Sequence, residues 1–178
     1  ALMAANIAPG INRGFNAEAW GNIVDKGLWR AARDEAIESE RTDIETDIQG
    51  YDIDEEMVSI ARANARAAGV EHLIHFQRRD VRDLSHAKKY GFIITNPPYG
   101  ERLSADTGVR GLYEALGERY RALDEWSMYV ISSYEDAERY IGRKADKNRK
   151  IYNGMLKTYY YQYMGAKPPK RNRDRDAE

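Results

Sequence analysis

The sequence predicts an α/β fold built on a mostly parallel, twisted sheet with helices on both faces. The first observation is that strand-like apolar runs alternate with segments whose apolar residues recur at helical spacing, an order that is typical of parallel sheets. The second is the pair Asn153-Gly154 between two strand-like runs near the carboxyl end. Because Asn-Gly favours a type I′ turn, we expect an antiparallel C-terminal hairpin beside the parallel strands.

Composition narrows the class of protein. The 178 residues are 42% hydrophobic and 32% charged, which suits a globular domain with a charged surface. The formal charge is −1, so any surface for nucleic acid must be local. Cysteine is absent, which excludes disulfides, thiolate metal sites and a cysteine nucleophile and fits a cytoplasmic location. The three histidines share no ligand spacing, and no apolar run approaches a membrane span, so we expect neither a metal site nor a membrane contact.

The first part of the chain predicts two helical segments before the first strand. Ala1 to Asn6 have the character of a helix end, which the breaker Ala8-Pro9-Gly10 stops. An irregular, aromatic stretch from Ile11 to Gly21 follows, and then a helix from about Ile23 to Arg41. Asp47 to Asp52 form a predicted strand that ends in an acid.

The middle of the chain predicts one well-capped helix and two further strands. Asp54 is a suitable N-cap for a helix over Glu55 to Ala68, and Gly69 is a fitting residue just beyond its end. His72 to Gln77 is the second predicted strand. Gly91 to Thr95 is the third, and it leads into a proline-rich turn.

The last part of the chain predicts a strand between two helices. After a polar loop, Glu101 to Gly108, the spacing predicts an amphipathic helix over Val109 to Leu123. Trp126 to Ser132 is a predicted strand, and Tyr134 to Ile141 a short helix with Ser133 as its cap.

The hairpin then completes a single predicted domain. Its strands are Lys150 to Tyr152 and Met155 to Met164, on either side of the Asn-Gly turn. Residues 1–166 form the predicted domain, and the charged tail at 167–178 is predicted to be disordered.

Three polar residues follow successive predicted strands: Asp52, Asp80 and Asn96. In a doubly wound sheet, such positions line one crevice. Asp52 can accept hydrogen bonds from a ribose diol, although a helix cap or a solvated turn acid is an equal alternative. Asp80 can accept a hydrogen bond from an adenine amino group; taken alone, a turn role is favoured.

The turn Asn96-Pro97-Pro98-Tyr99 is the most specific feature of the sequence. Two prolines make it stiff and remove two N–H donors. The Asn96 side-chain oxygen and the Pro97 carbonyl can both accept from one exocyclic amino group, which draws its nitrogen toward tetrahedral geometry and frees the lone pair for attack. Tyr99 offers a ring on which an unstacked base can lie. The alternative is a connecting turn with a packed tyrosine.

Asn-Pro-Pro-Tyr after a strand resembles the catalytic motif of S-adenosylmethionine-dependent methyltransferases that act on exocyclic amines, which have a Rossmann-like class I fold. Further segments resemble the RlmL-like branch of these enzymes: Asn6 to Arg13, Phe15 to Trp20, Gly50 to Asp54 and Asn153-Gly154. Members of that branch methylate the guanine 2-amino group of large-subunit ribosomal RNA. They also carry the label of adenine-specific DNA methylases, because the motif is shared.

The resemblance implies roles for individual residues. Asp52 with Ile53 would hold the cofactor ribose, and Asp80 with Val81 its adenine. Asn96 would border the cofactor and, with Pro97, Pro98 and Tyr99, hold the target base. The family's first strand, its glycine-rich loop and its THUMP-type RNA-binding domains are expected before Ala1. We therefore expect residues 1–178 alone to bind the cofactor weakly and to be inactive.

The sequence leaves two other functions open. One is an adenine 6-amino methyltransferase that acts on DNA, and the other is a non-catalytic RNA-binding module. Basic pairs at Arg78-Arg79 and Lys88-Lys89 and the cluster Lys144 to Lys150 can contact phosphate, although solvated turns are the safer interpretation. The absence of cysteine argues against methylation at pyrimidine carbon 5, which needs a thiolate.

Overall fold

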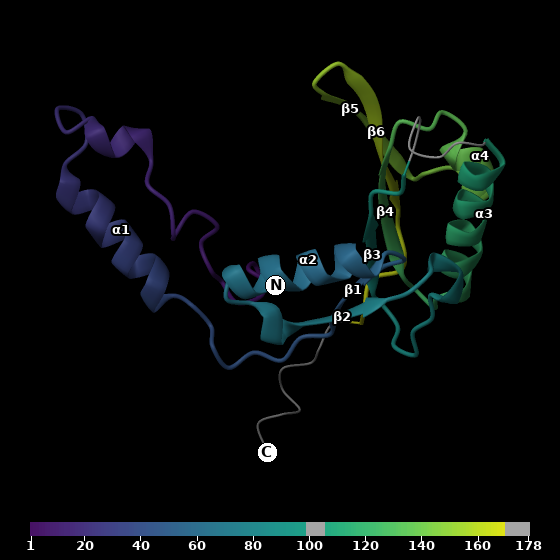
Figure 1. The fold of residues 1–178 in the computed structure, drawn as a ribbon, viewed down its shortest axis with the longest axis horizontal. Coiled ribbons are helices and arrows are strands. Elements are labelled where there is room, and N and C mark those ends of the chain that lie inside the picture. The colour runs from purple at the N-terminus through teal and green to yellow at the C-terminus, as the bar shows by residue number, and fades with distance from the viewer. Residues whose placement is uncertain (99–105, 170–178) are drawn as a thin grey trace. The chain divides into compact units, whose positions relative to one another are not determined.

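The computed structural model describes residues 1–98 and 106–169. The chain forms two compact units, Ala1–Arg78 and Arg79–Glu178 (Figure 1). Its helices and strands alternate as the sequence predicts, and the C-terminal hairpin is present. In chain order the elements are η1 (Asn16–Ala19), α1 (Lys26–Glu38), β1 (Ile48–Asp52), α2 (Glu55–Ala67), η2 (Glu71–Leu73), β2 (Ile74–Arg78), η3 (Val81–Asp83), β3 (Phe92–Thr95), α3 (Asp106–Ala122), β4 (Ser127–Ser132), α4 (Ala137–Ile141), β5 (Lys147–Asn153) and β6 (Leu156–Tyr163), where η marks a 3-10 helix.

The first unit contains a parallel pair of strands, β1 and β2, whose register places Asp52 opposite Arg78. Helix α2 connects them and begins as predicted, because the Asp54 side chain accepts a hydrogen bond from the Glu56 N–H at 2.8 Å. It ends as predicted too, since Gly69 follows the helix with a φ of +73°. A small core packs α2 against its neighbouring segments, formed by Ala5, Ala65, Val70 and Leu73, and α1 adds no buried residue to it.

Helix α1 carries the irregular segment that precedes it in the sequence. The Arg33 guanidinium donates to the carbonyls of Ile11 and Arg13, both at 2.8 Å, and to the Glu18 carboxylate at 2.7 Å. The Glu18 pKa lies below its ordinary value, because the Phe15 N–H and then Arg33 stabilise the charged form. One side chain therefore fixes most of the turn between residues 11 and 18.

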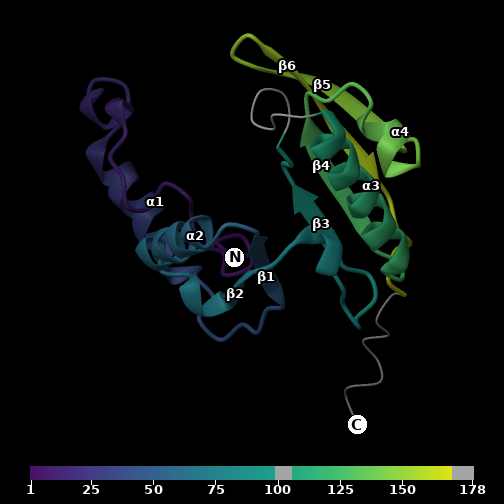
Figure 2. The same cartoon turned by 45° about the vertical axis from the view of Figure 1, so that its right-hand side comes forward.

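The second unit is a four-stranded sheet in the order β3-β4-β6-β5. Strands β3 and β4 are parallel, whereas β6 is antiparallel to both of its neighbours. Helices α3 and α4 lie on one face of this sheet (Figure 2). Its core contains the fully buried residues Tyr113, Met128, Val130, Ile141 and Tyr163.

Close packing of α3 against α4 depends on one glycine. A Cβ atom at Gly117 would lie 2.2 Å from the carbonyl oxygen of Ile141. Since Cβ atoms essentially never come so close to another atom, α4 can pack here only against a helix without a side chain at this position.

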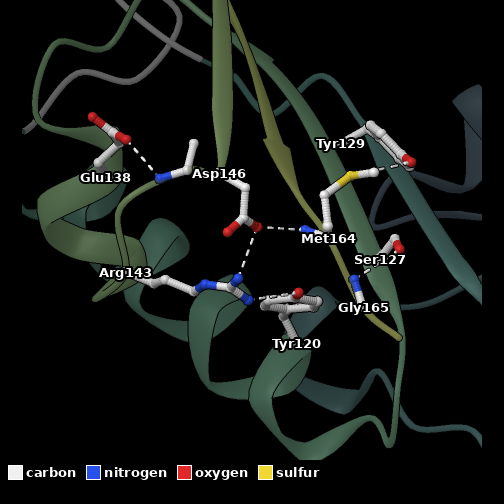
Figure 3. A network of polar contacts seen from close by, with 9 residues as sticks. Tyr120, Ser127, Tyr129, Glu138, Arg143, Asp146, Met164 and Gly165 are labelled. Carbon is white, nitrogen blue, oxygen red and sulfur yellow. Dashed lines mark hydrogen bonds and ion pairs between the residues drawn. The ribbon is translucent and has the colours of Figure 1, made fainter. Parts of the chain in front are cut away.

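The base of the hairpin is tied to the helices by a polar network (Figure 3). The Asp146 carboxylate accepts from the Met164 N–H and from Arg143, each at 2.7 Å. Arg143 also donates to the Tyr120 hydroxyl at 3.1 Å. These bonds keep the pKa of Asp146 below its ordinary value, with the Met164 N–H as the larger cause. The start of β5 is thus anchored to the end of β6 and to α3.

Three sequence predictions about helix ends were wrong. The short helix starts at Ala137 rather than Tyr134, and its N-cap position is Asp136 rather than Ser133. The reason is local: the Ser132 hydroxyl accepts the Tyr134 N–H at 2.9 Å, which holds the preceding residues in a turn. Helix α1 is shorter than the predicted Ile23 to Arg41, and Ala1 to Asn6 form turns rather than a helix end.

Among residues 1–98 and 106–169, no helix has the length and apolar character needed to cross a membrane. The tail prediction at 167–178 falls largely outside these residues, and so do residues 101–105 of the predicted loop. The loop prediction was wrong at 106–108, which belong to α3.

Candidate functional site

Asn96 lies directly after β3, at the strand's carboxyl end. Its side chain is exposed, the next residue, Pro97, is buried, and Pro98 is exposed. None of the residues that the structure describes forms a hydrogen bond with the Asn96 side chain. Tyr99, the fourth residue of the predicted motif, lies outside the described residues. At the position where the sequence predicts the target-base site, the structure therefore has a strand end whose amide is bonded by none of the described residues.

The sequence explains why this amide lacks one common local partner, the backbone N–H two residues later. Asp52 and Asp80 each accept a hydrogen bond from the backbone N–H two residues later, at 2.9 and 2.8 Å. Aspartate and asparagine commonly form this turn. Two residues after Asn96 stands Pro98, which has no N–H. Pro98 therefore denies Asn96 the turn that occupies the two aspartates.

Trp126 fixes the start of β3, a role that the sequence reasoning missed. Its indole N–H donates to the Lys88 carbonyl at 2.7 Å, and its ring lies where a Cβ at Gly91 would sit, 2.4 Å away. The Ser127 N–H donates to the Gly91 carbonyl at 3.0 Å. A glycine just before a short apolar strand was the available signal, since it often marks the close approach of a large side chain.

Asp80 is engaged with its own turn. One carboxylate oxygen accepts the Arg82 N–H and the other the Arg82 guanidinium, both at 2.8 Å. These contacts, the backbone N–H first, hold the pKa of Asp80 below its ordinary value of 3.8. Val81 packs against the core of the second unit. The turn role that the sequence allowed for Asp80 is thus present.

Asp52 ends β1 and is exposed. One of its oxygens accepts from Asp54, and no other described residue bonds to its carboxylate. Ile53 is 58% exposed, and its carbonyl accepts from Arg78 at 2.9 Å. The pair therefore offers a carboxylate oxygen and an apolar side chain side by side.

This pair fits the adenosine part of a nucleotide cofactor. A free carboxylate oxygen can accept from a ribose diol, and an exposed isoleucine can cover the flat face of a base. Asp80 fits less well, because both of its oxygens already accept from Arg82. The described residues contain no group of three or more acidic, histidine or cysteine side chains that could hold a metal ion.

The predicted convergence of these residues stays a prediction. Asp52 and Ile53 belong to the first unit, whereas Asp80, Val81 and Asn96 belong to the second. Within the second unit, no hydrogen bond joins Asp80 to Asn96 in the described part of the chain.

Comparison with known proteins places the chain in a family. The family model "RMKL-like, methyltransferase domain" (UPF0020) matches residues 1–162. "Putative RNA methyltransferase YpsC" of Bacillus subtilis is 43% identical over 177 residues, which cover 99% of this chain and 46% of that protein. "Ribosomal RNA large subunit methyltransferase K/L" of Shewanella frigidimarina is 37% identical over 168 residues, which cover 92% of this chain and 24% of that protein. The chain spans less than half the length of these relatives.

A solved structure supports the same assignment. The protein described as "SMU.472, a putative methyltransferase complexed with SAH" is 44% identical and superposes with a TM-score of 0.86, over 94% of this chain and 44% of that one. At this likeness the two share their fold, which confirms the predicted Rossmann-like α/β class with its antiparallel C-terminal strands. The chain belongs to the RMKL-like methyltransferase domain family, a family of S-adenosylmethionine-dependent enzymes.

Proposed function

We propose that the protein containing this chain transfers a methyl group from S-adenosylmethionine to an exocyclic amine of an RNA base. The proposed target is the guanine 2-amino group of large-subunit ribosomal RNA. The observation that carries the proposal is the Asn96 amide directly after β3, with which no described residue forms a hydrogen bond. The names of the two relatives support RNA as the substrate class, and a ribosomal substrate implies a cytoplasmic location.

In this proposal Asn96 and Pro97 orient the amine. The Asn96 side-chain oxygen and the Pro97 carbonyl each accept one N–H of the amino group, so its nitrogen lone pair points away from them. S-adenosylmethionine supplies a methyl group on a positively charged sulfur. The amine attacks that methyl in line, the carbon–sulfur bond breaks, and the amine's extra proton leaves to solvent. The residues act by positioning and by placing acceptors where positive charge develops, so no covalent enzyme intermediate is needed.

The remaining sites have supporting roles. Asp52 and Ile53 are proposed to hold the adenosine of the cofactor, and Val81 to border its adenine beside Asp80. Tyr99 is proposed to stack on the target base once the base leaves its helix. Residues outside this chain are proposed to complete the cofactor site and to select the RNA, because the chain spans less than half of its relatives.

The test is methyl transfer by the native protein that contains this chain. Tritium from labelled S-adenosylmethionine should enter ribosomal RNA and not duplex DNA, and nucleoside analysis should find N2-methylguanosine. The variant Asn96→Ala should lose at least about 100-fold in transfer, the effect of removing an oriented polar group from a reacting centre. Its cofactor affinity should change little.

Three results would contradict the proposal in different ways. N6-methyladenine in DNA would favour the adenine methyltransferase alternative. RNA binding without transfer to either nucleic acid would favour a non-catalytic module. Transfer by Asn96→Ala at the normal rate would remove Asn96 from the mechanism.

A further inference from the structure

We infer that the outer half of the β5–β6 hairpin is a contact surface for single-stranded RNA. This inference rests on the proposed RNA substrate and adds a surface that does not include Asn96. The hairpin extends beyond α3 and α4, so its outer half leaves the core of the unit (Figures 1 and 2). Met155 near its tip is fully exposed.

Four side chains alternate on one face of this outer half. The antiparallel register places Lys150 opposite Tyr159 and Tyr152 opposite Lys157. Residues two apart on a strand share a face, so all four lie on the same side of the hairpin. The Lys150 ammonium lies 5.0 Å from the centre of the Tyr152 ring, and the Lys157 ammonium 5.1 Å from that of Tyr159. We call these four residues the lysine–tyrosine patch.

Burial separates Tyr152 from the tyrosines of the core, against which Tyr159 still packs. Tyr161 and Tyr163 lie on the same face of β6, but they are only 3% and 0% exposed, because α3 and α4 cover them. Tyr152 is 62% exposed and Tyr159 is partly buried. Packing among the described residues therefore explains why tyrosines stand at the core positions. It does not explain why an aromatic ring stands at the exposed position 152.

Charge around the patch complements a polyanion. The segment from Gly142 to Gly165 holds a single acid, Asp146, which is bound to Arg143. Glu135, outside this segment, is the carboxylate that interacts with Lys157. The chain as a whole has a charge of −1, so the positive charge here is local. The cations of the segment are Arg143, Lys144, Lys147, Arg149, Lys150 and Lys157.

The second face of the hairpin repeats the combination of cation and ring. Arg149 pairs with the half-buried Tyr160, and Lys147 with Gln162. On the first face, Tyr159 raises the pKa of Lys157, which favours the charged form of that lysine, and Lys150 lowers the pKa of Tyr152.

Single-stranded RNA matches these features. Proteins that bind single strands combine cations along the phosphate backbone with aromatic rings on which successive bases stack. The patch presents both groups in alternation on one face, where Lys150, Tyr152 and Lys157 are exposed and Tyr159 is partly buried. Duplex DNA keeps its bases stacked inside the helix, so its bases are not available to stack on the tyrosine rings. A base that is pulled out for methylation leaves unpaired neighbours, which are suitable partners for such a surface.

The experiment measures RNA affinity of the native protein by fluorescence anisotropy. The probe is a fluorescein-labelled single-stranded RNA of about 20 nucleotides, long enough to cover one site. The double variant Lys150→Gln/Lys157→Gln should weaken binding and lower the slope of log affinity against log salt by about 1.4, which corresponds to two lost phosphate contacts. Tyr152→Leu should weaken binding about tenfold with an unchanged salt slope, because it removes a stacking ring.

A matched control removes the same charge elsewhere. Lys26 and Arg30 are exposed on α1, and Lys26→Gln/Arg30→Gln should leave the affinity and the salt slope unchanged. Melting temperatures of all variants should match that of the native protein, since the altered residues lie at the surface.

Each outcome has one meaning. If the native protein methylates ribosomal RNA and the hairpin variants bind RNA as tightly as the control variant, the inference is wrong and the proposed function stands. If hairpin substitutions weaken RNA and duplex DNA equally, the single-stranded partner is wrong. If the native protein neither binds nor methylates RNA, the proposed function fails together with the inference. The inference is supported if the hairpin variants lose affinity for single-stranded RNA while the control variant and the affinity for duplex DNA are unchanged.

Discussion

The turns after β2 and β3 both follow the carboxyl end of a strand and both carry a polar residue. The side chains of these two residues differ in their hydrogen bonding. Asp80 uses both carboxylate oxygens to bind Arg82. The Asn96 side chain forms no hydrogen bond with any of the described residues. A polar residue at a strand end is therefore a weak indication of a site, because the backbone that follows can occupy it. A polar side chain that its own turn cannot satisfy is a stronger one.

The difference lies in the second residue after each polar group. Arg82 has a backbone N–H that returns to Asp80. Pro98 has none, and Pro97 holds the chain extended. The two prolines thus do more than stiffen the turn, since they keep the Asn96 oxygen available for a hydrogen bond from elsewhere.

Of the substitutions that alter these two turns, the larger effect is expected from giving Asn96 a local partner. Pro98→Ala supplies an N–H two residues after Asn96, and the Asn96 side chain can then form the turn that Asp52 and Asp80 form. We expect methyl transfer to fall about tenfold, the equivalent of one added hydrogen bond of about 1.4 kcal/mol that must break before the amine is bound. Single-turnover transfer with saturating RNA measures the effect.

A double-mutant cycle separates this effect from loss of rigidity. In an Asn96→Ala background, Pro98→Ala should cause no further loss of transfer, because there is no amide left to occupy. A tenfold loss of transfer in both backgrounds would mean that Pro98 acts by stiffening the turn. The missing N–H of Pro98 would then not explain the difference between Asp80 and Asn96.

A smaller effect is expected at Asp80. Its pKa is lowered in the folded protein, so its contribution to stability is present above the unfolded pKa and disappears as the pH falls through the lowered folded value. Asp80→Asn keeps an acceptor for the Arg82 N–H but loses the ion pair. Since the Arg82 side chain is 57% exposed, we expect a loss of less than about 1 kcal/mol at neutral pH.

Acid unfolding checks this prediction. Melting temperatures of the native protein and of Asp80→Asn should differ at pH 7 and converge as the pH falls from the ordinary pKa of 3.8 through the lowered pKa of the folded state, below which the carboxyl group is protonated in both states. Asp83→Asn, on the same short helix, is the control. A difference that persists at low pH would show that the ion pair is not the cause.

Local signals predicted most of the fold. The Asp54 cap, Gly69 and the Asn-Gly turn each depend on a few neighbouring residues, and the structure contains the corresponding helix ends and hairpin. Failures arose where a neighbouring group competed, as when Ser132 accepted the Tyr134 N–H and displaced the predicted cap at Ser133. The insertion of β6 between β4 and β5 depends on long-range pairing, which a single sequence does not encode in a readable pattern.

The candidate site was predictable to a similar degree. The sequence correctly located Asn96 at a strand end, and the absent N–H of Pro98 was visible in it as well. It could not show that both Asp80 oxygens bind Arg82, because Arg82 could equally have pointed to solvent. Nor could it show that Trp126 covers Gly91 across 35 positions of the chain.

The central claim is that the Asn96 oxygen accepts a hydrogen bond from the target amine. The most direct measurement compares single-turnover methyl transfer by Asn96→Asp and Asn96→Ala in the native protein, with cofactor affinity measured alongside. Aspartate keeps an acceptor oxygen at the same reach, so Asn96→Asp should stay within about tenfold of normal transfer while Asn96→Ala loses at least about 100-fold. Equal losses in the two variants, with cofactor binding intact, would contradict the claim.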